Sequence, residues 1–237
     1  MIRTLIVDDD ALVRSGLRLM LGGAHDITVV GEVADGALVA EAVRELSPDV
    51  VLMDIRMPVM DGIAATGALA ASGTPAQVIV LTTFGGDDMI LAALRAGASG
   101  YLLKHTPPEE IVDAVRRAAD GEPVLSPAVM QVLIDQATKL PVAASAPTAP
   151  TAPTAPAPVA ERAVSERALA AQTRLGVLSA REREVASAVA RGMTNAEIAT
   201  EMFLSMGTVK SHISSALTKL DMTNRIQLAL LGYEAER

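Results

Sequence analysis

The chain has 237 residues, of which 50% are hydrophobic and 20% charged, and its formal net charge is −8 at pH 7. This length allows one or two domains, and so large an apolar fraction excludes global disorder. Because cysteine is absent, the sequence excludes disulfides and thiolate chemistry. Every apolar run is far shorter than a membrane span of roughly 18 residues. The sequence therefore predicts a cytoplasmic protein without membrane contact.

The charge is unevenly distributed along the chain. Residues 1–138 carry 9 Lys and Arg against 19 Asp and Glu, whereas residues 161–237 carry 10 against 9. Between these regions, residues 141–158 hold 6 of the 13 prolines and repeat Thr-Ala-Pro, which is typical of a semi-rigid polyproline II spacer. The sequence therefore predicts two domains with different partners, joined by a Pro/Ala/Thr-rich linker over 139–160.

The first half alternates short β-branched runs with helical patterns. The expected strands are 2–7, 27–33, 50–53, 78–81 and 100–103, and the expected helices lie near 11–21, 36–46, 62–72, 87–97 and 109–120. Five such units predict an α/β fold with a doubly wound, five-stranded parallel sheet. A helical extension over 123–138 follows before the linker.

Polar residues follow four of these strands. They are Asp8 and Asp9 after the first strand, Asp54 after the third, Thr82 after the fourth and Lys104 after the fifth. The carboxyl ends of parallel strands meet at one edge of a sheet, so we expect these side chains to converge. Carboxylates favour Mg²⁺, lysine and threonine can hold phosphoryl oxygens, and an aspartate can act as a nucleophile.

Each of these residues also has an ordinary structural role when taken alone. An aspartate after a strand is usually a helix cap, and we expect this role for Asp10 at the start of the first helix. The joint placement of the others at the ends of different strands favours a phosphoryl-transfer site.

The first half resembles the receiver domain of two-component response regulators in four segments: LIVDDD, VVLMDIRMPVMDG, VIVLTTF and GASGYLLK. The resemblance covers residues 1–122 and implies a flavodoxin-like receiver. It implies that Asp54 is the phosphoacceptor for a sensor histidine kinase, and that Mg²⁺ is held by Asp8, Asp9, Asp54 and the backbone carbonyl of Arg56.

The same resemblance assigns roles to three further residues. Thr82 and Lys104 would contact the phosphoryl group. Thr82 and Tyr101 would be the switch residues, whose side chains change position when the domain is phosphorylated. One departure from the family pattern is His105, which stands where proline is usual.

The second half is expected to be helical. Residues 161–175 predict a charged linker helix, followed by helices near 180–191, 195–202, 206–220 and 224–236. Two short helices joined by about three residues indicate a helix-turn-helix. The segment 206–220 contains no acidic residue. The helical spacing of its apolar residues places Lys210, Ser211 and Ser214 on the outer face, toward solvent or a DNA major groove. A solvated polar face remains the alternative, because this half is only weakly basic.

Residues 178–229 resemble the LuxR-type DNA-binding domain of NarL/FixJ regulators, which places that domain at 176–237. The resemblance implies contacts with double-stranded DNA by Lys210, Ser211, His212 and Ser214, phosphate contacts by Thr208 and Asn195, and a last helix that dimerises. Ser215 departs from the pattern, since arginine is frequent there, and so does Met206-Gly207.

Together these features predict a DNA-binding response regulator that forms a homodimer when phosphorylated and controls transcription. It would not be an enzyme beyond self-phosphorylation and self-dephosphorylation. Two alternatives remain. One is a phosphorylation-independent regulator or scaffold. The other is a Mg²⁺-dependent phosphohydrolase, but such an enzyme would need a general acid two residues after Asp54, where Arg56 stands. With so long a linker, the domains could be coupled only through receiver dimerisation.

Overall fold

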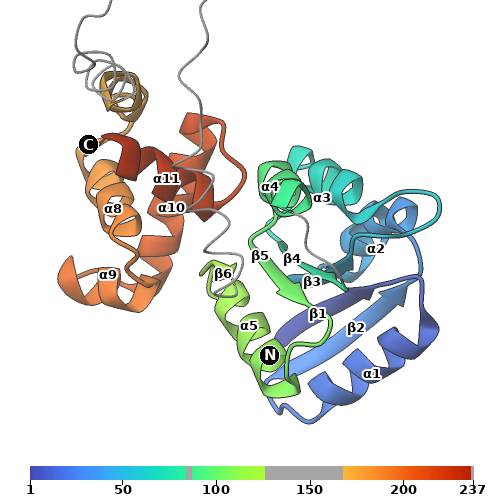
Figure 1. Ribbon diagram of the computed structural model, residues 1–237. Helices are drawn as coiled ribbons and strands as arrows, with labels where there is room; N and C mark the ends of the chain where they lie inside the picture. The colour runs from blue at the N-terminus through green and yellow to red at the C-terminus, as the bar shows by residue number, and fades with distance from the viewer. Residues whose placement is uncertain (84–86, 126–167, 236–237) are drawn as a thin grey trace, which may run out of the picture.

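The computed structural model describes residues 1–83, 87–125 and 168–235, which form an α/β part and a helical part (Figure 1). Predictions for residues 126–167, which include the linker and most of the helical extension, lie outside the described residues. Residues 168–175 are helical, as predicted for the end of the linker helix. Within the described ranges, no helix is both long and apolar enough to cross a membrane.

The α/β part is built on a parallel sheet in the order β2-β1-β3-β4-β5-β6. The strands are β1 (Ile2–Val7), β2 (Ile27–Val33), β3 (Val50–Asp54), β4 (Gln77–Thr82), β5 (Gly100–Leu103) and β6 (Val124–Leu125). The doubly wound parallel fold is confirmed, but the count of five strands is wrong. The sixth strand has two residues, which is too short to display a hydrophobic period.

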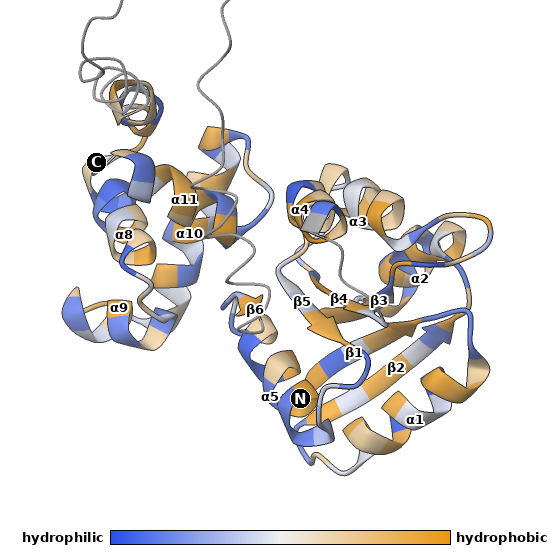
Figure 2. Ribbon diagram, viewed as in Figure 1, coloured by the Kyte–Doolittle hydropathy of each residue, from blue (hydrophilic) through white to orange (hydrophobic). Residues whose placement is uncertain are grey.

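Helices cover both faces of this sheet (Figure 1). They are α1 (Ala11–Gly22), the 3₁₀ helix η1 (Gly36–Leu38), α2 (Val39–Leu46), α3 (Gly62–Ala71), α4 (Asp87–Ala96) and α5 (Pro108–Ala119). Alternate strand residues point to opposite faces, so Leu5 and Val7 pack with α2, α3 and α4, whereas Ile6 packs with α1 and α5. Figure 2 shows that hydrophobic residues predominate in β5 and in part of β1.

The helical part contains α8 (Ala180–Ala190), α9 (Asn195–Glu201), α10 (Met206–Leu220) and α11 (Arg225–Ala235) around its own core. The first three of these helices begin at hydroxyl caps, because Ser179, Thr194 and Ser205 each accept a backbone N–H of the first turn. Helices α9 and α10 are joined by a short turn in which Phe203 adopts a left-handed φ of 55°. This arrangement is the helix-turn-helix that the sequence predicts.

A buried carboxylate ties α8 to α10. Glu182 is only 5% exposed, and its oxygens accept from Lys219 Nζ at 2.7 and 2.8 Å and from Ser215 Oγ at 2.6 Å. The Lys219 ammonium, followed by the Ser215 hydroxyl and the Ser179 backbone N–H, holds the pKa of Glu182 well below its usual range. Ser215, which departs from the family pattern, therefore has a structural partner here.

We expect Glu182→Gln to lower the melting temperature of the helical part at neutral pH. A depressed folded pKa stabilises the fold above the unfolded value of about 4.3, and this stabilisation is lost as the pH falls through the folded pKa. Melting followed by circular dichroism should therefore depend less on pH below about pH 4 in the variant. Glu184→Gln is the matched control, because Glu184 is exposed and pairs with Arg181 across one helical turn. An equal effect of both changes would contradict the assignment.

Candidate functional site

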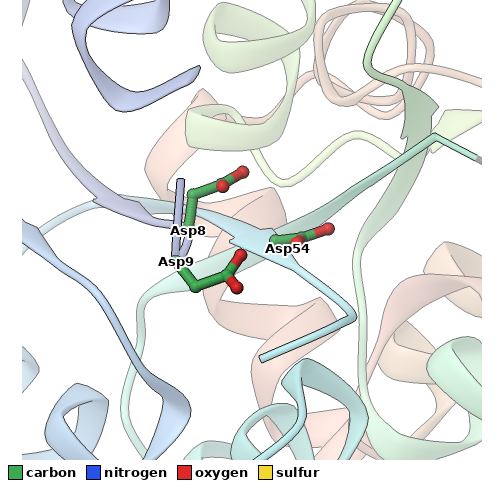
Figure 3. Close-up of side chains that lie close together, drawn as sticks. All are labelled: Asp8, Asp9 and Asp54. Carbon is green, nitrogen blue, oxygen red and sulfur yellow. The ribbon is translucent and has the colours of Figure 1, made fainter. Parts of the chain in front are cut away.

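Three carboxylates converge at the carboxyl edge of the sheet, as the strand ends predict. Asp8 and Asp9 follow β1 and Asp54 ends β3, and their ligand oxygens lie within 4.8 Å of one another (Figure 3). The parallel register pairs Val7 with Met53, so the next residue along each strand is an aspartate. Asp8 is 1% and Asp54 6% exposed, whereas Asp9 is open to solvent.

Backbone packing fixes the loop that follows Asp54. Gly62 N donates to Ile55 O at 2.8 Å, and a methyl group at Gly62 would lie 1.9 Å from the carbonyl oxygen of Asp54. Only glycine permits so close an approach. The chain therefore turns back tightly enough for α3 to start against the backbone of Asp54.

One ammonium group bridges two of the carboxylates. Lys104 Nζ, which follows β5, lies 2.6 Å from Asp8 Oδ2 and 3.1 Å from Asp54 Oδ2. Burial by itself would lower the pKa of Lys104, but the adjacent Asp8 and Asp54 carboxylates outweigh that effect and raise it. For Asp54, burial raises the pKa and the Lys104 ammonium opposes the shift. Lys104 is therefore a fixed cation beside Asp54.

The donor set suits a hard divalent cation. Three carboxylates face a single ammonium group, so the cluster retains excess negative charge that a cation can neutralise. Oxygen ligands from a few carboxylates, with the remaining positions left to water, are what Mg²⁺ prefers. The residues of this cluster fit that ion.

The predicted switch residues lie on β4 and β5, the two strands that follow β3 in the sheet, and Thr82 contacts the backbone of Lys104. Thr82 is 1% exposed at the end of β4, and its carbonyl accepts from Lys104 N at 2.8 Å. Tyr101 on β5 is fully buried, and burial raises the pKa of its hydroxyl. Arg56 Nη2 donates to Thr83 Oγ1 at 3.0 Å, which links the loop after β3 to the loop after β4. The remainder of that second loop, residues 84–86, lies outside the described residues.

The predicted DNA-binding helix contacts the α/β part. Lys210 Nζ lies 3.1 Å from Asp120 Oδ1 and 3.2 Å from Ala119 O, at the end of α5. Asn195 Nδ2 donates to the backbone carbonyl of Asp120, and its side chain is 1% exposed. Asn195 is thus covered in this arrangement, whereas the Lys210 side chain contacts α5 but is still 42% exposed.

The other residues predicted to contact DNA are at least partly accessible. Ser211 and Ser214 are exposed, and His212 and Thr208 are partly exposed. Thr208 contributes to the cap of α10, where its N–H donates to Ser205 Oγ at 3.1 Å.

A second inter-domain contact was not foreseen from the sequence. Asn224 Nδ2 donates to Leu94 O at 2.8 Å and to Ala98 O at 3.1 Å, at the end of α4. Ile226 of α11 is 7% exposed and joins the hydrophobic core of the α/β part. The domains therefore touch directly, which differs from coupling through receiver dimerisation alone. No local sequence signal marks Asn224 for this contact, because its partners lie about 130 residues away.

Comparison with known proteins gives two family matches. Residues 4–116 match the family described as the response regulator receiver domain. Residues 176–231 match the family described as bacterial regulatory proteins, luxR family. Between them the two matches cover the acidic cluster and the helix-turn-helix.

Proteins of similar length match along almost the whole chain. The transcriptional regulatory protein LiaR of Bacillus subtilis (strain 168) is 37% identical over 233 residues, which cover 98% of this chain and 97% of LiaR. The nitrate/nitrite response regulator NarL of Escherichia coli (strain K12) is 32% identical over 230 residues, covering 97% and 94%. The crystal structure of the response regulator ChrA of a heme-sensing two-component system is 34% identical with a TM-score of 0.50, covering 99% and 98%.

Proposed function

Because the chain belongs to the two-component response regulators that combine a receiver domain with a LuxR-type DNA-binding domain, we propose that Asp54 accepts a phosphoryl group from a sensor histidine kinase in the cytoplasm. Phosphorylation then promotes homodimerisation and binding to double-stranded DNA. The proposed domains are the receiver over 1–122, a helical extension over 123–138, the linker over 139–160, a linker helix over 161–175 and the DNA-binding domain over 176–237.

The single observation that carries this proposal is the position of Lys104 between Asp8 and Asp54. In the proposed reaction, an Asp54 oxygen attacks the phosphorus atom in line, and the bond to the kinase histidine breaks. The Lys104 ammonium balances charge on the transferred group. Once Asp54 is phosphorylated, the Thr82 hydroxyl moves toward the oxygens of the phosphoryl group. Positioning and charge neutralisation provide most of the rate in phosphoryl transfer.

Asp8, Asp9, Asp54 and the Arg56 carbonyl would hold Mg²⁺, which neutralises charge on the transferring phosphoryl group. Without such neutralisation, carboxylates this close repel an incoming anion. The only chemistry proposed for the protein itself is phosphorylation and later hydrolysis at Asp54.

In this proposal, DNA binding is controlled because the receiver domain and DNA compete for contacts with α10. Lys210 pairs with Asp120, and in the proposed active state Lys210, Ser211, His212 and Ser214 face the major groove instead. Thr208 and Asn195 would then contact phosphates. Release of α10 requires that the contact between Asn224 and α4 also breaks.

We expect Asn224→Asp to strengthen DNA binding by the unphosphorylated protein about tenfold, because loss of one or two buried hydrogen bonds costs roughly 1–3 kcal/mol. The aspartate keeps the oxygen that accepts from Gln227 N at 2.9 Å at the start of α11. It replaces the amide donor with an oxygen facing two carbonyls.

Titration of labelled DNA measures this effect, and Asn224→Ser, which retains a capping oxygen without the charge, should give a smaller change. If Asn224→Asp binds DNA no more tightly than the wild type, the contact with α4 does not restrain α10.

A further inference from the structure

The loop between β3 and α3, residues 55–61, is held at its tip by a residue from another part of the sheet. Asp35, which follows β2, accepts from Val59 N at 2.9 Å and from Met60 N at 3.1 Å. The same carboxylate accepts from Ala37 N at 2.9 Å, where it caps η1. One side chain therefore joins two loops that are 24 residues apart in the chain.

The base and the tip of this loop are held by different forces. Ile55 and Met57 are 3% and 8% exposed, so hydrophobic burial fixes the base. The side chain of Val59 at the tip is 81% exposed, and burial of that side chain therefore contributes little. At the tip, the partly buried Met60 side chain packs against the core, and the hydrogen bonds from Val59 N and Met60 N to Asp35 hold the backbone.

The backbone next to Asp35 also lies against this loop. A methyl group at Gly36 would lie 2.4 Å from Met60 O and 3.1 Å from the Ala65 side chain. Such an approach requires glycine, and it brings the Asp35 carboxylate within reach of two backbone N–H groups. Asp35 and Gly36 together thus hold the backbone of Val59 and Met60 in place.

We propose that Asp35 is a positioning residue of the phosphoryl-transfer site, which holds the loop so that the Arg56 carbonyl stays in place as a Mg²⁺ ligand beside Asp54. This role rests on the proposed function, because it assumes that the acidic cluster binds Mg²⁺. Residues that orient the ligands of a metal commonly change its affinity by 10- to 100-fold when removed.

The state of the Asp35 carboxyl agrees with this geometry. Hydrogen bonds from the backbone of Ala37, then Val59 and then Met60 lower its pKa. The group is therefore ionised at neutral pH, where a carboxylate accepts from all three N–H groups and forms stronger bonds than a neutral acid does.

Calorimetric titration of the full chain with Mg²⁺ tests the role directly. We expect Asp35→Ala to weaken Mg²⁺ binding about tenfold and Asp35→Asn to weaken it less, because an amide oxygen can still accept one or two of the bonds. At saturating Mg²⁺, the rate of phosphorylation by a small phosphodonor should stay close to that of the wild type. This split separates positioning of the metal ligand from a general loss of the fold.

Asp61→Ala is the matched control. Asp61 lies in the same loop and caps α3 by accepting from Ala64 N at 2.7 Å, but it does not hold the tip. Its loss should reduce the melting temperature without changing Mg²⁺ affinity. If Asp35→Ala also lowers only the melting temperature, Asp35 is merely a cap and the proposal is overturned. If the wild type itself binds no Mg²⁺, the proposed function fails, and this role fails with it.

Discussion

Asp54→Asn is expected to abolish phosphorylation while leaving the fold intact. An amide has no negative oxygen to attack phosphorus, and the new side chain has nearly the same shape in a site that is only 6% exposed. The variant also removes a carboxylate that burial already disfavours in its charged form, since the pKa of Asp54 is raised. Intact-protein mass spectrometry after treatment with a small phosphodonor and Mg²⁺ measures the result.

Asp61→Asn provides the control for this experiment, because it changes a carboxylate that caps α3 and lies outside the cluster. It should gain one phosphoryl group, as the wild type does. A phosphorylated Asp54→Asn protein, or a phosphopeptide that maps elsewhere in the wild type, would contradict the assignment of Asp54.

The second large effect is expected at Lys210. Lys210→Ala should weaken DNA binding by the phosphorylated protein by roughly 10- to 100-fold, which corresponds to about 1–3 kcal/mol for one lost contact. If Lys210 contacts a phosphate, the slope of log affinity against log salt should fall by about one. Titrations at several salt concentrations measure both quantities. Unchanged affinity across salt would contradict a role for Lys210 in DNA binding.

Asp120→Ala is the complementary variant, because it removes the partner of Lys210 from the receiver side. This change leaves the residues predicted to contact DNA unaltered and removes the ion pair with Lys210, so that only the backbone carbonyl of Ala119, 3.2 Å from Lys210 Nζ, still holds that ammonium group on the receiver side. The unphosphorylated variant should therefore bind DNA more tightly than the wild type, while its salt slope once phosphorylated should match that of the wild type. Opposite effects from the two ends of one ion pair would separate restraint by the receiver from DNA contact.

Much of the fold could be predicted because its signals are local. Asp10, Asp35 and Asp61 precede helices, and each accepts a backbone N–H of the turn that follows. The strand ends were also readable, since a parallel sheet must bring Asp8, Asp54 and Lys104 to one edge. Their convergence in the structure follows from that topology.

The inter-domain contacts could not be predicted, because they depend on how two separately folded parts pack together. Asn224 resembles an ordinary helix start in the sequence, yet its amide serves α4 of the other domain. Lys210 has the same outward position in the helix pattern whether it meets DNA, solvent or Asp120. The residues predicted to contact DNA stay predictions, and so do the metal ligands and the phosphoacceptor.

The central claim is that phosphorylation at Asp54 controls DNA binding, and one experiment tests it most directly. Oligomeric state and DNA retention are measured before and after treatment with a small phosphodonor and Mg²⁺, for wild type and Asp54→Asn in parallel. We predict that only the wild type gains one phosphoryl group, dimerises and binds DNA more tightly. Phosphorylation of the wild type without any change in DNA binding would contradict the claim.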